Sequence, residues 1–116
     1  MARIVGPTGR VLAFEPNPEA AALLATNIQL SLPDCVLVDI EGWEIAALLG
    51  ARRFLAAEPF PMLIIELHPD AWAWSGHSRH HLEALLKRYS LHIAPLSGQH
   101  DPLSQYGQVI ITRLTA

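Results

Sequence analysis

The stretch that most constrains the fold of this chain is residues 35–44, in which four apolar residues run directly into an acidic turn that contains a glycine. An uninterrupted apolar run bounded by turn residues is typical of a strand covered on both faces, as in a parallel sheet. Open α/β sheets bind their ligands outside the carboxyl ends of the strands, so Asp39 and Glu41 are candidate site residues. The alternative is that Asp39 only caps the helix that follows, since Asp is common at that position.

Length and composition indicate one domain, because 116 residues with 51% hydrophobic and 16% charged residues suffice for a single packed core. The formal net charge of -3 and the scattered Lys and Arg residues argue against a nucleic-acid partner. No apolar run approaches the roughly 20 residues of a membrane span, and the first residues lack the apolar core of a signal peptide. Cys35 is the only cysteine, so no internal disulfide can form, and we expect a cytoplasmic protein.

The N-terminal third has the pattern of a β-α-β unit. Residues 10–15 predict a short buried strand that ends at Glu15, which is a further candidate site residue. Asn17 can cap a helix over residues 18–30. Only residues 31–34 separate that helix from the next strand, an ordinary length for such a connection.

The strongest strand pattern lies at residues 61–69, which are mostly apolar and end in polar residues. Its end makes Glu66 and His68 candidate site residues. Between the two strands, the apolar spacing after Gly42 predicts a helix that ends at Gly50, followed by a second turn or short helix.

The C-terminal part predicts a helix and two strands. Residues 70–76 predict a loop with two tryptophans, which either walls a pocket or, the reading we favour, forms a partly buried flap. Ser78 can cap the helix that follows. Residues 91–96 and 107–114 predict strands, and the loop between them contains no helical pattern, which is typical of an antiparallel pair at one side of a sheet.

Metal binding and covalent nucleophilic chemistry are not indicated. His77 and His81 have a spacing that could place them on one helical face, but no third ligand is spaced with them and Ser78 starts the helix after His77. The chain has no Gly-x-Ser-x-Gly turn, and a lone cysteine in a strand is poorly placed to be a nucleophile. We therefore expect no metal site.

Several short motifs follow one another along the chain: residues 5–18, Asn27-Ile28, residues 38–44, residues 49–51 and residues 64–68. Together they resemble the successive signatures of the FkbM-type methyltransferases. That family is similar to other class I enzymes, which transfer a methyl group from S-adenosylmethionine on a Rossmann-like α/β sheet. Its members are associated with O-methylation of sugars and other small molecules, so the resemblance implies a small-molecule or sugar acceptor.

The resemblance implies a role for each candidate residue. Glu15 would hold the two ribose hydroxyls of S-adenosylmethionine, since a carboxylate can accept two hydrogen bonds from a vicinal diol, and Asn17 would lie near the adenosine. Asp39 and Glu41 would face the methyl-transfer region and orient or deprotonate an acceptor hydroxyl, with His68 as an alternative base.

Compared with the family pattern, the chain is shortened: the first strand with its glycine-rich loop and the third strand have no counterpart. We therefore predict a mostly parallel sheet in which the Glu15 strand pairs directly with the Asp39 strand, followed by strands 61–69, 107–114 and 91–96, with an antiparallel strand near the C-terminal edge. The missing loop predicts weak cofactor binding. The Glu15 strand becomes an open edge, which predicts a tendency to form homodimers.

Three functions stay open on the sequence. The first is methyl transfer with weak activity. The second is a non-catalytic remnant or interaction module that keeps the sheet and has lost cofactor binding. The third is a fragment whose missing strand comes from another chain.

Overall fold

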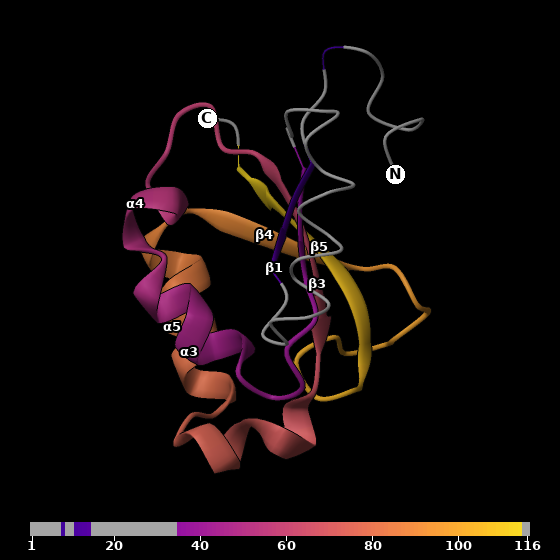
Figure 1. Cartoon of the computed structure of the whole chain (residues 1–116). Coiled ribbons are helices and arrows are strands. Elements are labelled where there is room, and N and C mark those ends of the chain that lie inside the picture. The colour runs from indigo at the N-terminus through magenta and orange to yellow at the C-terminus, as the bar shows by residue number, and fades with distance from the viewer. Residues whose placement is uncertain (1–7, 9–10, 15–34, 115–116) are drawn as a thin grey trace.

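Five strands form one mixed sheet in the order β1-β2-β3-β5-β4 (Figure 1). The computed structural model describes residues 8, 11–14 and 35–114. The strands are β1 (Val11–Phe14), β2 (Cys35–Val38), β3 (Met62–Leu67), β4 (Leu91–Pro95) and β5 (Gly107–Arg113). β1, β2 and β3 pair in parallel, whereas β5 pairs antiparallel with both β3 and β4. β5 thus runs against the other four strands.

This strand order is the one predicted from the sequence, including the direct pairing of the first two strands. Val11 pairs with Cys35 and Phe14 with Val38, so β1 lies at the edge of the sheet. The predicted helix at residues 18–30, together with Glu15 and Asn17, lies outside the described residues.

The helices that the structure describes are α3 (Glu44–Gly50), α4 (Arg52–Leu55), the 3₁₀ helix η1 (Pro69–Ser75) and α5 (Arg79–Arg88). Figure 1 shows α3, α4 and α5 on one side of the sheet. The connections from β2 to β3 and from β3 to β4 advance in the same direction across the sheet, and right-handed crossovers therefore place both on the same face. None of these helices is long and apolar enough to cross a membrane.

The hydrophobic core lies between that face of the sheet and the helices. Side chains alternate along β3, where Leu63, Ile65 and Leu67 are buried. The other fully or largely buried apolar residues come from the neighbouring strands, the helices and one loop: Val36, Val38, Ile45, Leu48, Leu55, Trp72, Leu82, Leu85, Leu91, Leu103, Val109 and Ile111. The core thus fixes where the strands end relative to α3 and η1.

The prediction of a loop at residues 70–76 is wrong, because all of these residues except the C-cap residue Gly76 belong to η1. Trp72 is only 2% exposed and packs in the core, whereas Trp74 is 80% exposed. The two tryptophans therefore do not form one flap. The buried Trp72 ring holds this short helix against the core, which the turn-like composition of the segment does not indicate.

Helix α5 begins where the sequence predicts, directly after its N-cap residue Ser78. The ring of His81 accepts a hydrogen bond from the Ser78 backbone N–H, with 3.1 Å between Nδ1 and N. This is a capping-box arrangement in which His takes the usual place of Glu or Gln. His81 is thus part of the helix start.

Candidate functional site

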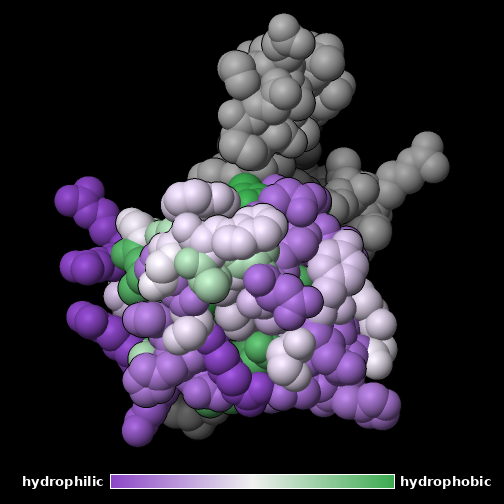
Figure 2. All heavy atoms as spheres, turned by 90° about the horizontal axis from the view of Figure 1, so that it is seen from below, coloured by the Kyte–Doolittle hydropathy of each residue, from purple (hydrophilic) through white to green (hydrophobic). Residues whose placement is uncertain are grey.

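The predicted residues after β2 and β3 gather at one end of the sheet. Val38, the last residue of β2, pairs with Ile65 near the end of β3, so the residues that follow β2 leave the sheet close to the end of β3. The ligand-type atoms of Asp39, Glu41 and His68 all lie within 4.8 Å of one another. Figure 2 views the molecule from this end, whose surface is largely hydrophilic with small apolar areas.

The turn after β2 is held close to η1. Glu41 and Gly42 have φ angles of 51° and 99°, in the left-handed region that glycine tolerates and glutamate seldom adopts. A Cβ atom on Gly42 would lie 2.6 Å from the Cβ of Ala71. The glycine therefore permits a close approach that fixes the direction in which the turn residues leave the sheet.

The alternative that Asp39 caps the next helix is wrong. Helix α3 begins at Glu44, its N-cap residue is Trp43, and no side chain caps it. The Asp39 side chain lies instead at the exposed end of β2. Partial desolvation is the largest cause that raises the pKa of the Asp39 carboxyl, and repulsion from the nearby Glu66 raises it further.

His68 lies between two carboxylates. Its Nδ1 atom is 2.9 Å from Oε1 of Glu44, and its Nε2 atom is 3.2 Å from Oε2 of Glu41. The His68 side chain is 13% exposed, whereas that of Glu41 is 80% exposed. The imidazole is thus enclosed on its Nδ1 side and faces a solvent-exposed carboxylate on its Nε2 side.

Glu44 is a residue of the candidate site that the sequence analysis did not single out. It is completely buried and accepts three hydrogen bonds, from the Gly42 N–H at 2.6 Å, the ring of His68 at 2.9 Å and the indole N–H of Trp72 at 2.7 Å. These donors belong to the turn after β2, to the end of β3 and to η1. A single carboxylate therefore ties together the three segments that surround the site.

Tyr106 covers another side of His68, with 5.1 Å between the ring centroids. Its hydroxyl donates a 2.7 Å hydrogen bond to Oε1 of Glu66, the last polar residue of β3. That hydrogen bond, together with burial and the surrounding carboxylates, raises the pKa of the Tyr106 hydroxyl. Tyr106 was not singled out from the sequence, where it stands in a polar loop.

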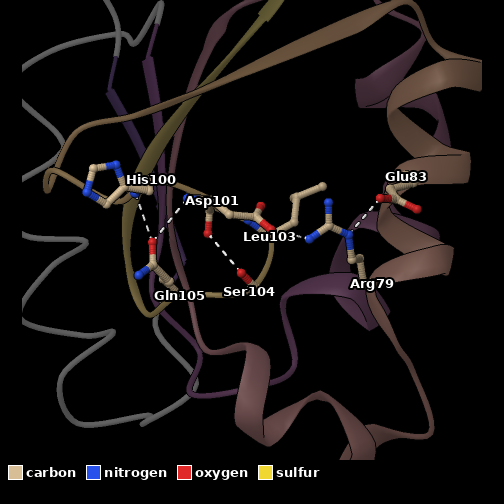
Figure 3. A network of polar contacts seen from close by, with 7 residues as sticks. All are labelled: Arg79, Glu83, His100, Asp101, Leu103, Ser104 and Gln105. Carbon is tan, nitrogen blue, oxygen red and sulfur yellow. Dashed lines mark hydrogen bonds and ion pairs between the residues drawn. The ribbon is translucent and has the colours of Figure 1, made fainter.

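The loop that carries Tyr106 is ordered by the polar network of Figure 3. Arg79 of α5 pairs with Asp101 in the loop and with Glu83 one turn further along the helix. The guanidinium of Arg79 lowers the pKa of the Asp101 carboxyl. Within the loop, the side-chain oxygen of Gln105 accepts hydrogen bonds from the backbone N–H groups of His100 and Asp101. The loop is thereby held against α5.

The site has the chemical groups to bind ligands that are positively charged or that donate hydrogen bonds. The donor set of Asp39, Glu41 and His68 has the atom types and spacing that a divalent cation can accept. The same carboxylates, with Glu66 beside them, favour any cationic group and can orient a hydroxyl, while the imidazole can accept a proton.

Comparisons of the chain with protein-family models, with curated proteins and with solved structures find no match.

Proposed function

We propose that the chain is an S-adenosylmethionine-dependent methyltransferase of the FkbM type that methylates a hydroxyl group of a small molecule or sugar. The observation that carries the proposal is that Asp39, Glu41 and His68 converge at the carboxyl ends of two adjacent parallel strands. A strand order of β1-β2-β3-β5-β4 with β5 antiparallel is what remains when the first and third strands are taken from the family's sheet. Two of the motifs that resemble the family, residues 38–44 and 64–68, fall on these same strand ends.

The residues of the site suit the cofactor chemically. The sulfonium group of S-adenosylmethionine is cationic, and the carboxylates of Asp39, Glu41 and Glu66 supply a negative environment at this edge. The family resemblance assigns the ribose hydroxyls to Glu15, one residue beyond β1. The last residue of β1, Phe14, pairs in register with Val38, which precedes Asp39. This pairing favours a cofactor that extends along the edge from β1 to β2.

When bound, the cofactor supplies an electrophilic methyl group on sulfur. The protein then has to hold the acceptor oxygen in line with that methyl group and accept the hydroxyl proton. Asp39 and Glu41 can accept hydrogen bonds from the acceptor, since both carboxylates lie at the exposed end of the strands. His68 is the remaining candidate for the proton acceptor.

Calorimetric titration with S-adenosylmethionine tests the proposal. We expect binding in the high micromolar range or weaker, and Glu15→Ala should abolish it, because one charge-assisted hydrogen-bonding group contributes about ten- to a hundredfold in affinity. Glu83→Ala, an exposed carboxylate on α5, is the control and should bind like the parent.

Two outcomes would contradict this assignment. Submicromolar binding would contradict the expected weak affinity, and binding indifferent to Glu15→Ala would place the ribose elsewhere. Complete absence of binding in the parent protein would favour the non-catalytic module instead.

A further inference from the structure

The most unusual ionisable group in the described part of the chain is Glu44, a carboxylate with no exposed surface. Burying a carboxylate is unfavourable unless hydrogen-bond donors compensate it. Glu44 has three donors, and the hydrogen bonds that reach it join two oxygens to the backbone of Gly42 and to the rings of His68 and Trp72. None of these three donors is a lysine or arginine. The carboxylate is therefore solvated by the protein through oriented N–H groups.

This arrangement determines which nitrogen of His68 carries the proton. A carboxylate oxygen only accepts hydrogen bonds, so the Nδ1 atom at 2.9 Å from Glu44 must be the donor. In the neutral ring, Nε2 is then the atom with the free lone pair. Nε2 lies on the side of Glu41, which is the exposed side of the site.

We propose that Glu44 is a positioning residue that holds the neutral His68 ring in its Nδ1–H form, so that Nε2 is the proton acceptor of the site. The proton-acceptor role rests on the proposed methyl transfer, whereas the tautomer does not. In that reaction the acceptor O–H bond breaks as its proton moves to Nε2. The new O–CH₃ bond forms, and the S–CH₃ bond breaks with its electron pair remaining on the neutral thioether.

Glu41 completes the arrangement after proton transfer. The imidazolium carries an N–H on both nitrogens, and it then has a carboxylate acceptor on each side, Glu44 at Nδ1 and Glu41 at Nε2. The side chains that would face both N–H groups are thus already in place around the ring.

The wild-type protein provides the first test. In protein labelled with ¹⁵N at histidine, the nitrogen shifts and ring couplings of a neutral imidazole distinguish the two tautomers, and the signals lost in His68→Gln identify His68 among the six histidines. We expect the proton on Nδ1. A neutral His68 ring with its proton on Nε2 would overturn the proposal, whatever any variant does.

Glu44→Gln provides the second test, because it keeps the side-chain shape and removes the charge. An amide oxygen is a weaker acceptor than a carboxylate, so the ratio of the Nδ1–H to the Nε2–H form should fall on the order of five- to tenfold. Glu83→Gln, the same change at an exposed glutamate of α5, is the control and should leave the His68 ratio unchanged.

The outcomes separate positioning from packing and from function. An unchanged tautomer ratio in folded Glu44→Gln would show that Glu44 does not control the His68 tautomer and only joins the surrounding segments, which would overturn the proposal. Should that variant not fold, the wild-type tautomer still decides. A fixed Nδ1–H form in a protein that transfers no methyl group would refute the proposed function and leave the positioning role of Glu44 intact.

Discussion

Replacing Gly42 by alanine tests how closely the turn after β2 approaches η1. Two costs combine at this position. A non-glycine residue held at a φ of 99° is strained by about 1–3 kcal/mol. The added Cβ atom would also lie 2.6 Å from the Cβ of Ala71, an overlap that costs about 1–3 kcal/mol if the surroundings shift to relieve it. The free energy of unfolding should therefore fall by roughly 2–6 kcal/mol.

Two other glycines separate these costs. Gly76 has a φ of 77°, but a Cβ atom there would meet nothing within 4 Å, so Gly76→Ala should cost only the backbone strain of about 1–2 kcal/mol. Gly50, the last residue of α3, has neither a left-handed φ nor a close neighbour. Gly50→Ala should leave the stability unchanged or raise it by up to about 1 kcal/mol.

Urea unfolding followed by tryptophan fluorescence measures all three variants under the same conditions. We expect Gly50→Ala to be the most stable of the three variants, Gly76→Ala to be less stable, and Gly42→Ala to be the least stable. If Gly42→Ala is no less stable than Gly76→Ala, then the turn does not lie close against η1. The positions described for the site residues in that turn would then be wrong.

Three further predictions follow from the site and the sheet. Trp72→Phe should destabilise the protein by about 1–3 kcal/mol in urea unfolding, because it leaves one oxygen of the buried Glu44 without its donor, whereas the exposed Trp74→Phe should change stability by less than about 0.5 kcal/mol. The pKa of Asp39 is raised in the folded state, so the folded protein binds the proton more tightly and its stability falls as the pH rises from the ordinary aspartate pKa through the folded-state pKa. Asp39→Asn should therefore be more stable than the parent at pH 7 in urea unfolding, and an equal or lower stability there would contradict the raised pKa. Within the part of the chain that the structure describes, β1 has a single neighbour in the sheet, so we expect concentration-dependent association in light scattering that Leu12→Lys reduces. A parent protein that stays monomeric at high concentration would contradict the dimer and leave the fold unaffected.

Much of the fold could be predicted because its signals are local. Continuous apolar runs mark β2 and β3, and the helical pattern between them requires a crossover, which makes the two strands parallel. Once two strands are parallel and adjacent, their carboxyl ends lie together. The proximity of Asp39, Glu41 and His68 is thus a consequence of strand periodicity and chain direction, which the sequence carries.

The partners of His68 could not be predicted in this way. Glu44 stands in the first turn of a helix, where an acidic residue normally interacts with the helix dipole at the surface. Its burial depends on donors 24 and 28 residues further along the chain, His68 and Trp72. Trp72 in turn lies in a segment whose composition indicates a loop.

The sequence by itself therefore indicated which segments are strands, that β2 and β3 are parallel, and the end of the sheet at which Asp39, Glu41 and His68 meet, whereas the complete strand order was expected from the resemblance to the family. Only the tertiary structure decided that Glu44 is buried, that it binds Nδ1 of His68, and that Tyr106 lies against the same ring. The physical reason is that strands and the crossover helices between them are marked by the local periodicity of the chain. A buried hydrogen-bond network instead requires donors and acceptors from distant segments to be brought together, and that happens only when the helices pack on the sheet.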